Sequence, residues 1–260
     1  YKELGDASPL KEPGDIDMLI VRELTGGIYF GKQGSYKSSE KLFDGTRKGI
    51  IAYDTESYSE AEISRILRRG FEFALKRRKK LTVVDKANVL NTSRLWRNLA
   101  KEISNDYPDV EMDFLYVDNC SMQLVSRPST FDVIVTSNMF GDILSDLAGQ
   151  ITGSVGLLPS ASLGNPGMPG LFEPIHGSAP DIAGQNKANP IASILSVQLM
   201  LKLHLGEKDA AESISQAVRK TLEQGIRTPD IAVNGREDGK AKTVLVNTQQ
   251  MTECIIANLE

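Results

Sequence analysis

Apolar and polar positions alternate along the chain in two ways that together predict an α/β protein. Short apolar runs without a helical period are typical of buried strands. Longer stretches with a single apolar stripe lie between them and are typical of helices that pack on a sheet. The expected strands cover 16–23, 81–84, 112–117, 131–136 and 171–175. One expected helix begins at Ser59, and the others cover 93–105, 121–125, 139–148, 190–205, 210–222 and 248–259. This alternation favours a layered α/β architecture.

The helix that begins at Ser59 has the clearest local signals. Ser59 and Glu62 have the spacing of a capping box, in which each side chain bonds to the other residue's backbone N–H. Five consecutive basic residues, 76–80, follow near its C-terminal end. We interpret them as a solvated last turn that complements the helix dipole. A nucleic-acid patch is less favoured, because no aromatic side chains interleave the run.

Three segments lack this periodicity. Residues 31–52 are rich in glycine, lysine and serine and predict a long exposed loop or arm. The stretch 153–170 is rich in glycine, serine and proline, and we expect it to wrap a ligand or an interface. Residues 228–242 predict a further polar loop. The helix expected over 190–205 is mostly apolar and should be buried on most sides.

Composition narrows the functional classes. Of the 260 residues, 40% are hydrophobic and 25% are charged, which is ordinary for a globular protein and unlike a disordered, collagenous or disulfide-rich chain. The net charge of −4 argues against a broad nucleic-acid footprint. Two cysteines, Cys120 and Cys254, are too few for a disulfide framework, so a reducing compartment is the default.

Three aspartates are candidate metal ligands. Asp142 and Asp146 are four residues apart, so they lie on one helix face, where two like charges repel unless a cation lies between them. Asp118 follows an expected strand, and ligands of α/β proteins bind where strands end. Carboxylate oxygens suit Mg²⁺ or Mn²⁺. The alternative is that Asp142 and Asp146 are two exposed aspartates on a solvated face.

Two further patterns offer groups for proton transfer and carboxylate binding. Lys86 follows the strand 81–84, where partial desolvation can lower the pKa of a lysine enough for it to act as a base. Arg22 and Tyr29 flank the double glycine 26–27; arginine binds carboxylates through two N–H groups, and a tyrosine can donate a proton. A surface lysine and a structural turn with a half-buried tyrosine are the alternatives.

A loop of small residues, 176–184, precedes Asn189 and Pro190 at the start of an expected helix. Its backbone N–H groups can bind a phosphate or an adenine edge, and the Asp181 carboxylate can bind a ribose diol. An ordinary loop with a helix cap is the alternative. No G-x-G-x-x-G fingerprint occurs, so a Rossmann site is not supported.

In this order the motifs resemble those of the β-decarboxylating dehydrogenases, the family of isopropylmalate, isocitrate, homoisocitrate, tartrate and D-malate dehydrogenases. The resemblance covers nearly the whole chain. Residues 23–27, Glu-Leu-Thr-Gly-Gly, have the form of the isopropylmalate enzymes, whereas isocitrate and D-malate relatives usually carry Asn at the position of Leu24. The stretches that carry the resemblance are 21–31, 84–90, 116–119, 138–146, 156–162 and 176–184.

The resemblance implies a role for each matching position. Lys86 is expected to take the proton from the substrate hydroxyl, and Tyr29 to protonate the carbon left after CO₂ departs. Arg22, Val89 and Asp118 are expected to contact the substrate, Val89 in the isopropyl pocket. Asp118, Asp142 and Asp146 are expected to hold Mg²⁺ or Mn²⁺. The cofactor is expected to be NAD, because Asp181 disfavours a 2′-phosphate. The expected NAD contacts are Asn88, His176, Gly177, Ser178, Ala179, Pro180, Asp181, Ile182, Ala183, Gly184 and Asn189.

The resemblance also implies a fold and an assembly. We expect an isopropylmalate dehydrogenase-like α/β/α fold with a non-Rossmann cofactor site, in which 1–152 is the dimerisation, metal and substrate domain. Residues 153–260 would be the C-terminal half of the cofactor domain. Relatives carry a leading segment with the first strands of that domain and two more substrate arginines, so we expect an N-terminal part to be absent from this chain. A homodimer is expected, in which Lys86 and Asp118 reach the neighbouring subunit's site.

The implied reaction is the NAD-dependent oxidative decarboxylation of 3-isopropylmalate to 2-oxoisocaproate, in leucine biosynthesis. An enzyme acting on homoisocitrate, tartrate or D-malate, and a non-catalytic regulatory subunit of such an enzyme, are the alternatives. A small-molecule substrate is expected, with no nucleic-acid or membrane partner, and the cytoplasm is the default compartment.

Overall fold

The computed structural model describes residues 2–12, 14–38, 49–165, 167–232 and 243–260. The chain divides into two compact units, Asp17–Ser145 and Tyr1–Ile16 with Asp146–Glu260. In these units residues 1–16 fold with the C-terminal part and the cut falls at 145/146, whereas the division expected from the resemblance lies at 152/153. The assignment of a function to each part stays a prediction. No helix in the described ranges is long and apolar enough to cross a membrane.

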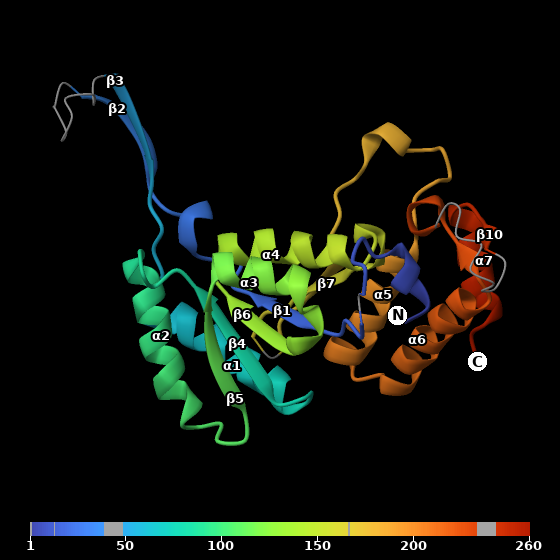
Figure 1. Ribbon diagram of the computed structural model, residues 1–260, viewed down its shortest axis with the longest axis horizontal. Helices are drawn as coiled ribbons and strands as arrows, with labels where there is room; N and C mark the ends of the chain where they lie inside the picture. Colours follow the sequence, from blue (N-terminus) through green and yellow to red (C-terminus); the bar gives the residue numbers. More distant parts are fainter. Residues whose placement is uncertain (1, 13, 39–48, 166, 233–242) are drawn as a thin grey trace. The chain divides into compact units, whose positions relative to one another are not determined.

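A four-stranded sheet forms the centre of the unit Asp17–Ser145 (Figure 1). Its strands lie in the order β1-β6-β4-β5, and every pair is parallel. Because parallel strands end at one edge, the residues that end them, or directly follow them, gather there. The strands are β1 (Leu19–Arg22), β4 (Lys80–Asp85), β5 (Glu111–Tyr116) and β6 (Val133–Thr136).

Four helices accompany this sheet. The capping box at Ser59 is confirmed: its side chain accepts from the Glu62 backbone N–H, and the Glu62 carboxylate accepts from the Ser59 backbone N–H. The apolar stripe of the first helix packs with Trp96 of the second and with the inner face of the sheet. The helices are α1 (Glu60–Leu75), α2 (Asn91–Ser104), α3 (Val117–Ser126) and α4 (Asn138–Ile151). Helix α3 is longer than the expected 121–125, so Asp118 lies in its first turn rather than in a loop.

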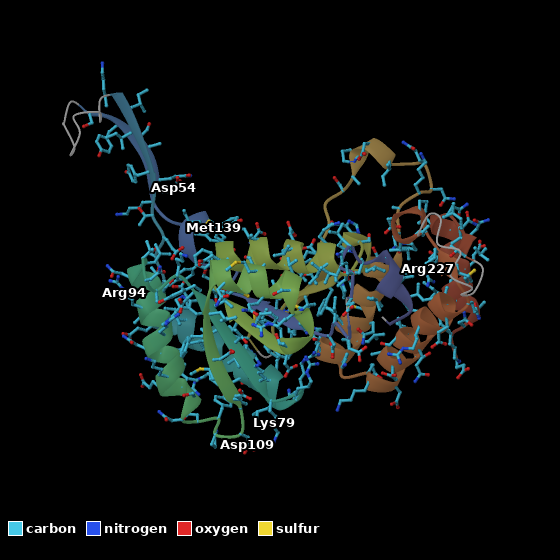
Figure 2. All side chains as sticks on the ribbon, viewed as in Figure 1. Asp54, Lys79, Arg94, Asp109, Met139 and Arg227 are labelled. Carbon is cyan, nitrogen blue, oxygen red and sulfur yellow. The ribbon has the colours of Figure 1, made fainter. Side chains whose placement is uncertain are left out.

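The basic run 76–80 is not simply a solvated last turn, and that interpretation is corrected. Asp132 is buried at the start of β6, and its carboxylate accepts from Arg77 Nε at 2.7 Å and from the Arg78 backbone N–H at 2.8 Å. Lys79 pairs with Asp109, Nζ to Oδ2 3.6 Å, at the edge where β4 and β5 begin (Figure 2). The run therefore neutralises carboxylates at the edge opposite to the strand ends.

Residues 31–52 were expected to form an exposed loop or arm, and the structure shows an arm built from two strands. Strands β2 (Gln33–Ser38) and β3 (Gly49–Asp54) pair antiparallel and project from the sheet (Figure 1). The Tyr36 and Tyr53 rings pack against each other, with their centres 6.4 Å apart. Residues 39–48 lie outside the described part of the chain.

The other unit has its own core, formed by residues such as Leu157, Ile191, Leu222 and Met251. Its helices are α5 (Ile191–Met200), α6 (Lys208–Glu223) and α7 (Thr248–Ala257). Its strands form two pairs, the antiparallel β7 (Pro159–Ser162) with β8 (Leu171–Pro174) and the parallel β9 (Ile226–Arg227) with β10 (Val244–Leu245).

Two expectations about this unit need correction. Strand β7 lies inside 153–170, for which no strand was expected, because its short polar sequence gives no strand signal; whether this stretch wraps a ligand or an interface stays a prediction. The helix over 190–205 was expected to be buried on most sides. Its first part, α5, is largely buried, but the π-helical turn Leu201–Leu205 that follows is largely exposed. The polar loop expected at 228–242 lies mostly outside the described residues, which resume at 243.

Candidate active site

Arg22 ends β1 and extends along the start of α4. Its Nε and Nη2 donate to Asn138 Oδ1 at 3.1 and 2.8 Å, and its Nη1 donates to Asp142 Oδ1 at 2.6 Å. Asn138 and Asp142 are one helical turn apart, so one face of α4 binds the whole guanidinium group. The structure therefore brings together two residues that the sequence predicts for the site, Arg22 and Asp142.

Gly141 makes this approach possible. A Cβ atom at this position would lie 2.6 Å from Arg22 Cγ and 2.8 Å from Arg22 Cβ, closer than real contacts allow. The absence of a side chain at this position in the first turn of α4 is thus what lets the arginine stem lie directly on the helix. Glycine in a helix costs stability, about 0.5–1 kcal/mol relative to alanine, and here the cost accompanies the placement of Arg22.

Tyr29 joins the same cluster. It ends the short 3₁₀ turn Gly27–Tyr29, and its hydroxyl donates to Asp142 Oδ2 at 2.9 Å. The hydrogen bond to this carboxylate raises the pKa of Tyr29, while the Arg22 guanidinium lies 5.6 Å from its ring centre. The Tyr29 side chain is 54% exposed, so a ligand can reach its hydroxyl.

The double glycine turn before Tyr29 rests on a buried tyrosine. Gly27 has a φ of +80°, and a Cβ there would lie 2.0 Å from the Tyr58 hydroxyl oxygen. Burial raises the pKa of Tyr58 to about 12, so it is a neutral packing group that accepts a bond from the Asn138 backbone N–H at 3.0 Å. Tyr58 also meets Trp96 edge to face at 5.9 Å. Only glycine permits this close contact, which explains the double glycine.

Asn138 was not among the residues predicted from sequence. It is 1% exposed, and its amide nitrogen donates to the carbonyl oxygens of Leu24 and Gly26, both at 3.0 Å. A polar residue that begins an apolar helix directly after a buried strand is the signal that could have identified it. It connects Arg22 to the turn that leads to Tyr29.

Lys86 and Asp118 form a second cluster at the same edge of the sheet. The Lys86 ammonium bonds to the Asp118 carboxylate, which lowers the pKa of Asp118. The Lys86 nitrogen also lies 5.8 Å from the centre of the Tyr116 ring, and its backbone N–H donates to Ser93 at 3.0 Å. Asn88 and Val89 are exposed in the turn that follows.

A buried ion pair holds the strand end that carries Lys86. Asp85 is 2% exposed, and its carboxylate binds Arg97 Nε at 2.5 Å and the Ala87 backbone N–H at 2.9 Å. The guanidinium carbon of Arg97 lies over the rings of Phe114 and Tyr116, 5.0 and 4.8 Å from their centres. The sequence analysis missed this pair as well, because the two residues are distant in the sequence and α2 brings them together.

The three predicted metal ligands do not meet within one chain. Asp142 is bound to Arg22 and Tyr29, Asp118 is bound to Lys86, and Asp146 is exposed one turn further along α4. Among the described residues, no three acidic, histidine or cysteine side chains are close enough to share an ion. The donor chemistry fits a hard divalent cation, since all three groups are carboxylates with exposed or half-exposed oxygens.

The loop predicted to bind the cofactor lies in the other unit and is mostly exposed. Ala179 has a left-handed φ of +43° ahead of the turn Pro180–Ile182, and Asp181 is exposed. Asn189, in contrast, is buried. Its amide nitrogen donates to Asp230 Oδ2 at 3.0 Å, and its oxygen accepts from the Ile191 backbone N–H at 3.0 Å. Asn189 thus supports the start of α5 in this structure.

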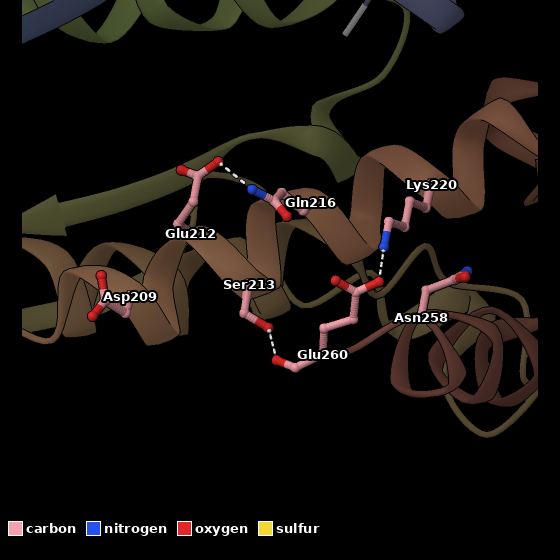
Figure 3. A pocket seen from close by; sticks show the side chains of 7 residues that line it. All are labelled: Asp209, Glu212, Ser213, Gln216, Lys220, Asn258 and Glu260. Atoms are coloured by element: carbon pink, nitrogen blue, oxygen red, sulfur yellow. Dashed lines mark hydrogen bonds and ion pairs between the residues drawn. The ribbon is translucent and has the colours of Figure 1, made fainter.

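A cavity of about 200 Å³ lies elsewhere, between α6 and the C-terminal residues (Figure 3). Its polar side chains bind one another: Lys220 pairs with Glu260, and Gln216 donates to Glu212 at 3.1 Å. None of the predicted site residues lines it.

Comparison with known proteins identifies similar chains. The family described as isocitrate/isopropylmalate dehydrogenase matches residues 1–255. The 3-isopropylmalate dehydrogenase of Aquifex aeolicus is 52% identical over 263 residues, which cover 100% of this chain and 68% of that protein. The 3-isopropylmalate dehydrogenase of Symbiobacterium thermophilum is 53% identical, over 90% of this chain and 64% of that protein.

The fold is also similar to that of solved structures. An isocitrate dehydrogenase from Methylococcus capsulatus superposes with a TM-score of 0.83 at 40% identity, covering 97% of this chain and 69% of that one. The TT0538 protein from Thermus thermophilus superposes with a TM-score of 0.79 at 36% identity, over 97% of this chain and 47% of that one. The chain thus spans about two thirds of the length of the curated relatives that it matches.

Proposed function

The chain belongs to the isocitrate/isopropylmalate dehydrogenase family, and we propose that it is an NAD-dependent 3-isopropylmalate dehydrogenase. The reaction is the oxidative decarboxylation of 3-isopropylmalate to 2-oxoisocaproate in leucine biosynthesis. The observation that carries the proposal is the contact of Arg22 and Tyr29 with one carboxylate, Asp142, in a chain 52% identical to a protein of that name. This cluster offers a carboxylate-binding group and a proton donor side by side.

Arg22 would bind a carboxylate of the malate moiety. Asn138 and Asp142 take three of its five N–H donors, so one N–H on each terminal nitrogen remains for a ligand. Two parallel N–H groups are the geometry in which arginine binds carboxylates most strongly.

Tyr29 and Lys86 would perform the two proton transfers. Lys86, in its neutral amine form, would take the proton from the 2-hydroxyl group as the carbon is oxidised, and Tyr29 would return a proton to the carbon that loses CO₂. The ordinary pKa of a phenol, about 10, already keeps Tyr29 protonated at neutral pH, as a proton donor requires, and the hydrogen bond to Asp142 raises this pKa further. A positioned acid or base of this kind contributes about 10²- to 10⁴-fold to a rate.

Asp118, Asp142 and Asp146 would hold Mg²⁺ or Mn²⁺, and residues 176–184 with Asn88 and Asn189 would contact NAD. When bound, the ion supplies positive charge for the oxygen that becomes negative as CO₂ leaves, and NAD⁺ supplies the hydride acceptor. Asp181 lies exposed in its loop, where its charge would repel the 2′-phosphate of NADP. Val89 is exposed beside Lys86 and would line the isopropyl pocket.

The active form would be a homodimer with shared sites. Within one chain the Lys86 cluster and the Arg22 cluster are separate sets of contacts among the described residues, which supports a metal site completed by a second copy. Helices α3 and α4 carry exposed apolar side chains, Met122, Val125 and Ile143, which such a partner would cover. We propose that residues 1–152 supply this interface and that 153–260 belong to the cofactor domain. We also propose the cytoplasm as the compartment.

The identity to 3-isopropylmalate dehydrogenases, 52–53%, exceeds the 40% to the isocitrate dehydrogenase, which supports the isopropylmalate substrate. The intact contacts of Lys86, Tyr29 and Asp142 support a catalytic rather than a regulatory subunit.

The test is a comparison of substrates with the purified full-length protein. We expect NAD⁺ and Mn²⁺ to support turnover of 3-isopropylmalate with a higher kcat/KM than homoisocitrate, tartrate or D-malate, and EDTA to abolish it. A preference for another of these acids refutes the substrate, and absence of turnover of all four by the protein alone refutes a catalytic subunit.

Shared sites have a separate test. Lys86→Met and Tyr29→Phe proteins should each be nearly inactive, but mixing after dissociation yields heterodimers in which one of the two sites is intact. A regain of about a quarter of the wild-type activity is expected from random pairing. If the mixture stays inactive while heterodimers form, both residues serve the same chain's site and the proposal of shared sites is wrong.

A further inference from the structure

We propose that Asn138 is a positioning residue, which fixes the orientation of the Arg22 guanidinium and thereby the recognition of the substrate carboxylate. The inference rests on the proposed function, since it concerns how the same site binds its substrate. It is carried by the hydrogen bonds of a side chain that is 1% exposed and begins α4.

The orientation follows from the way the arginine is bound. Asn138 Oδ1 accepts from both Nε and Nη2, the two donors along one side of the guanidinium plane. This two-point contact prevents the plane from rotating about the side-chain axis, which a single hydrogen bond would allow. Asp142 then binds Nη1, which leaves one N–H on each terminal nitrogen for a ligand.

The same carboxamide also fixes the turn that leads to Tyr29. Its nitrogen has two N–H groups, and both are used, one by the Leu24 carbonyl and one by the Gly26 carbonyl, each at 3.0 Å. The backbone N–H of Asn138 donates to Tyr58, which is itself buried against Trp96. Tyr58 thus fixes the main chain of Asn138, and the Asn138 side chain fixes both Arg22 and the turn before Tyr29.

Only an uncharged amide satisfies these partners. An aspartate has the same shape, but it cannot donate to the two carbonyl groups, and its oxygens would face them instead. Its negative charge would also neutralise Arg22 and compete with the substrate carboxylate. The structure therefore assigns two tasks to one side chain, acceptance from a cation and donation to a turn.

The decisive experiment is a double-mutant cycle on the full-length protein with Asn138→Ala and Arg22→Lys. Lysine keeps the charge but cannot form the two-point contact. We expect Asn138→Ala alone to raise the KM for 3-isopropylmalate about tenfold, the value of one hydrogen bond to a charged group, and to leave the KM for NAD⁺ within about twofold. In the Arg22→Lys protein the same change should alter the substrate KM by less than about twofold.

The non-additive result separates positioning from general stability. If Asn138 only supports the fold, its loss has the same effect on KM in both backgrounds, and the proposal is overturned. Asn258→Ala is the matched control, because Asn258 also uses its amide in several hydrogen bonds, to Thr221, Gln224 and the Cys254 carbonyl, but lies in the other unit. It should lower thermal stability without a change in either KM.

A second readout does not depend on activity. In the wild-type protein the Arg22 Nε–H should exchange slowly with solvent in ¹H–¹⁵N spectra, and its signal is identified by its disappearance in Arg22→Lys. Asn138→Asp retains an acceptor for this N–H, and Asn138→Ser is a milder variant if the alanine variant fails to fold. Fast exchange in the wild type, or equal protection in folded Asn138→Ala or Asn138→Ser, overturns the inference. If the wild-type protein turns over none of the substrates but its Arg22 Nε–H exchanges slowly, the proposed function is refuted and the positioning role of Asn138 is not.

Discussion

Replacing Gly141 with alanine tests the arrangement of Arg22 through a change that usually stabilises a helix. In an ordinary helix, Gly→Ala gains about 0.5–1 kcal/mol. Here the added Cβ would lie 2.6, 2.8 and 3.1 Å from Cγ, Cβ and Cδ of Arg22, whereas carbon atoms prefer about 3.5–4.0 Å. To relieve this clash, the Arg22 carbon atoms and the new Cβ must move apart by about 1 Å. Arg22 Cβ cannot move that far by rotation of the side chain, because it is bonded to the main chain of β1.

The clash should outweigh the gain in helix propensity. Overpacking of this kind costs about 1–3 kcal/mol, so we expect Gly141→Ala to lower the free energy of unfolding by about 1–2 kcal/mol. It should also raise the KM for the substrate, because Cγ and Cδ can move only by shifting the guanidinium away from Asn138 and Asp142. Urea unfolding and steady-state kinetics on the full-length protein measure the two effects.

Gly149 provides a control in the same helix. A Cβ there would lie 2.8 Å from Leu158 Cδ1, the end of a side chain that can rotate, so Gly149→Ala should be neutral or slightly stabilising. If Gly141→Ala is as stable as Gly149→Ala and its KM is unchanged, the close contact between Arg22 and α4 does not exist in solution, and the site described above is wrong in its central feature.

Three further variants probe separate parts of the structure. Tyr29→Phe should lower kcat about 10²- to 10⁴-fold with little effect on thermal stability, because the side chain is exposed; a retained kcat would exclude it as the proton donor. Arg97→Met leaves the Asp85 carboxylate buried without its counter-charge and should cost about 3 kcal/mol in urea unfolding, and a loss below about 1 kcal/mol would contradict the importance of the pair. Ser59→Ala should cost about 1 kcal/mol by removing the helix cap. Because the hydrogen bonds with Ser59 lower the pKa of Glu62, the part of this contribution that comes from the Glu62 carboxylate is present above pH 4.5 and is lost as the pH falls through the lowered value; a difference in stability that is constant down to pH 2 would argue against that part.

The sequence predicted most of what depends on local pattern. The apolar runs at 81–84 and 131–136 became buried strands, and the capping box at Ser59 begins α1 as expected. Arg22, Tyr29 and Asp142 were chosen for their chemistry, and the structure brings them together. The strands and the helix cap were predictable because spacing alone determines which face of an element a residue occupies, whereas Arg22, Tyr29 and Asp142 were chosen for their residue types.

What the sequence did not reveal depends on contacts between distant segments. Asp85 and Asn138 lie in stretches that carry the family resemblance, but their support of the site, like that of Tyr58 and Arg97, depends on contacts that spacing does not show. Asp132 gave no sign that it would bind the basic run, since a charged residue before an apolar strand ordinarily lies at the surface. The proposed sharing of sites between two copies rests on the family resemblance alone, because the structure of one chain contains no partner.

In the turn before Tyr29, the position of the main chain does not depend on the identity of the Leu24 side chain. Asn138 holds the main chain of Leu24 in place, while the Leu24 side chain is 40% exposed and takes no part in this network. Random changes at this position can therefore sample new ligands without disturbing the groups that perform the chemistry. In a laboratory selection for altered substrate range, we expect accepted replacements to accumulate at position 24 and to spare positions 22, 138 and 141, which tolerate change only together.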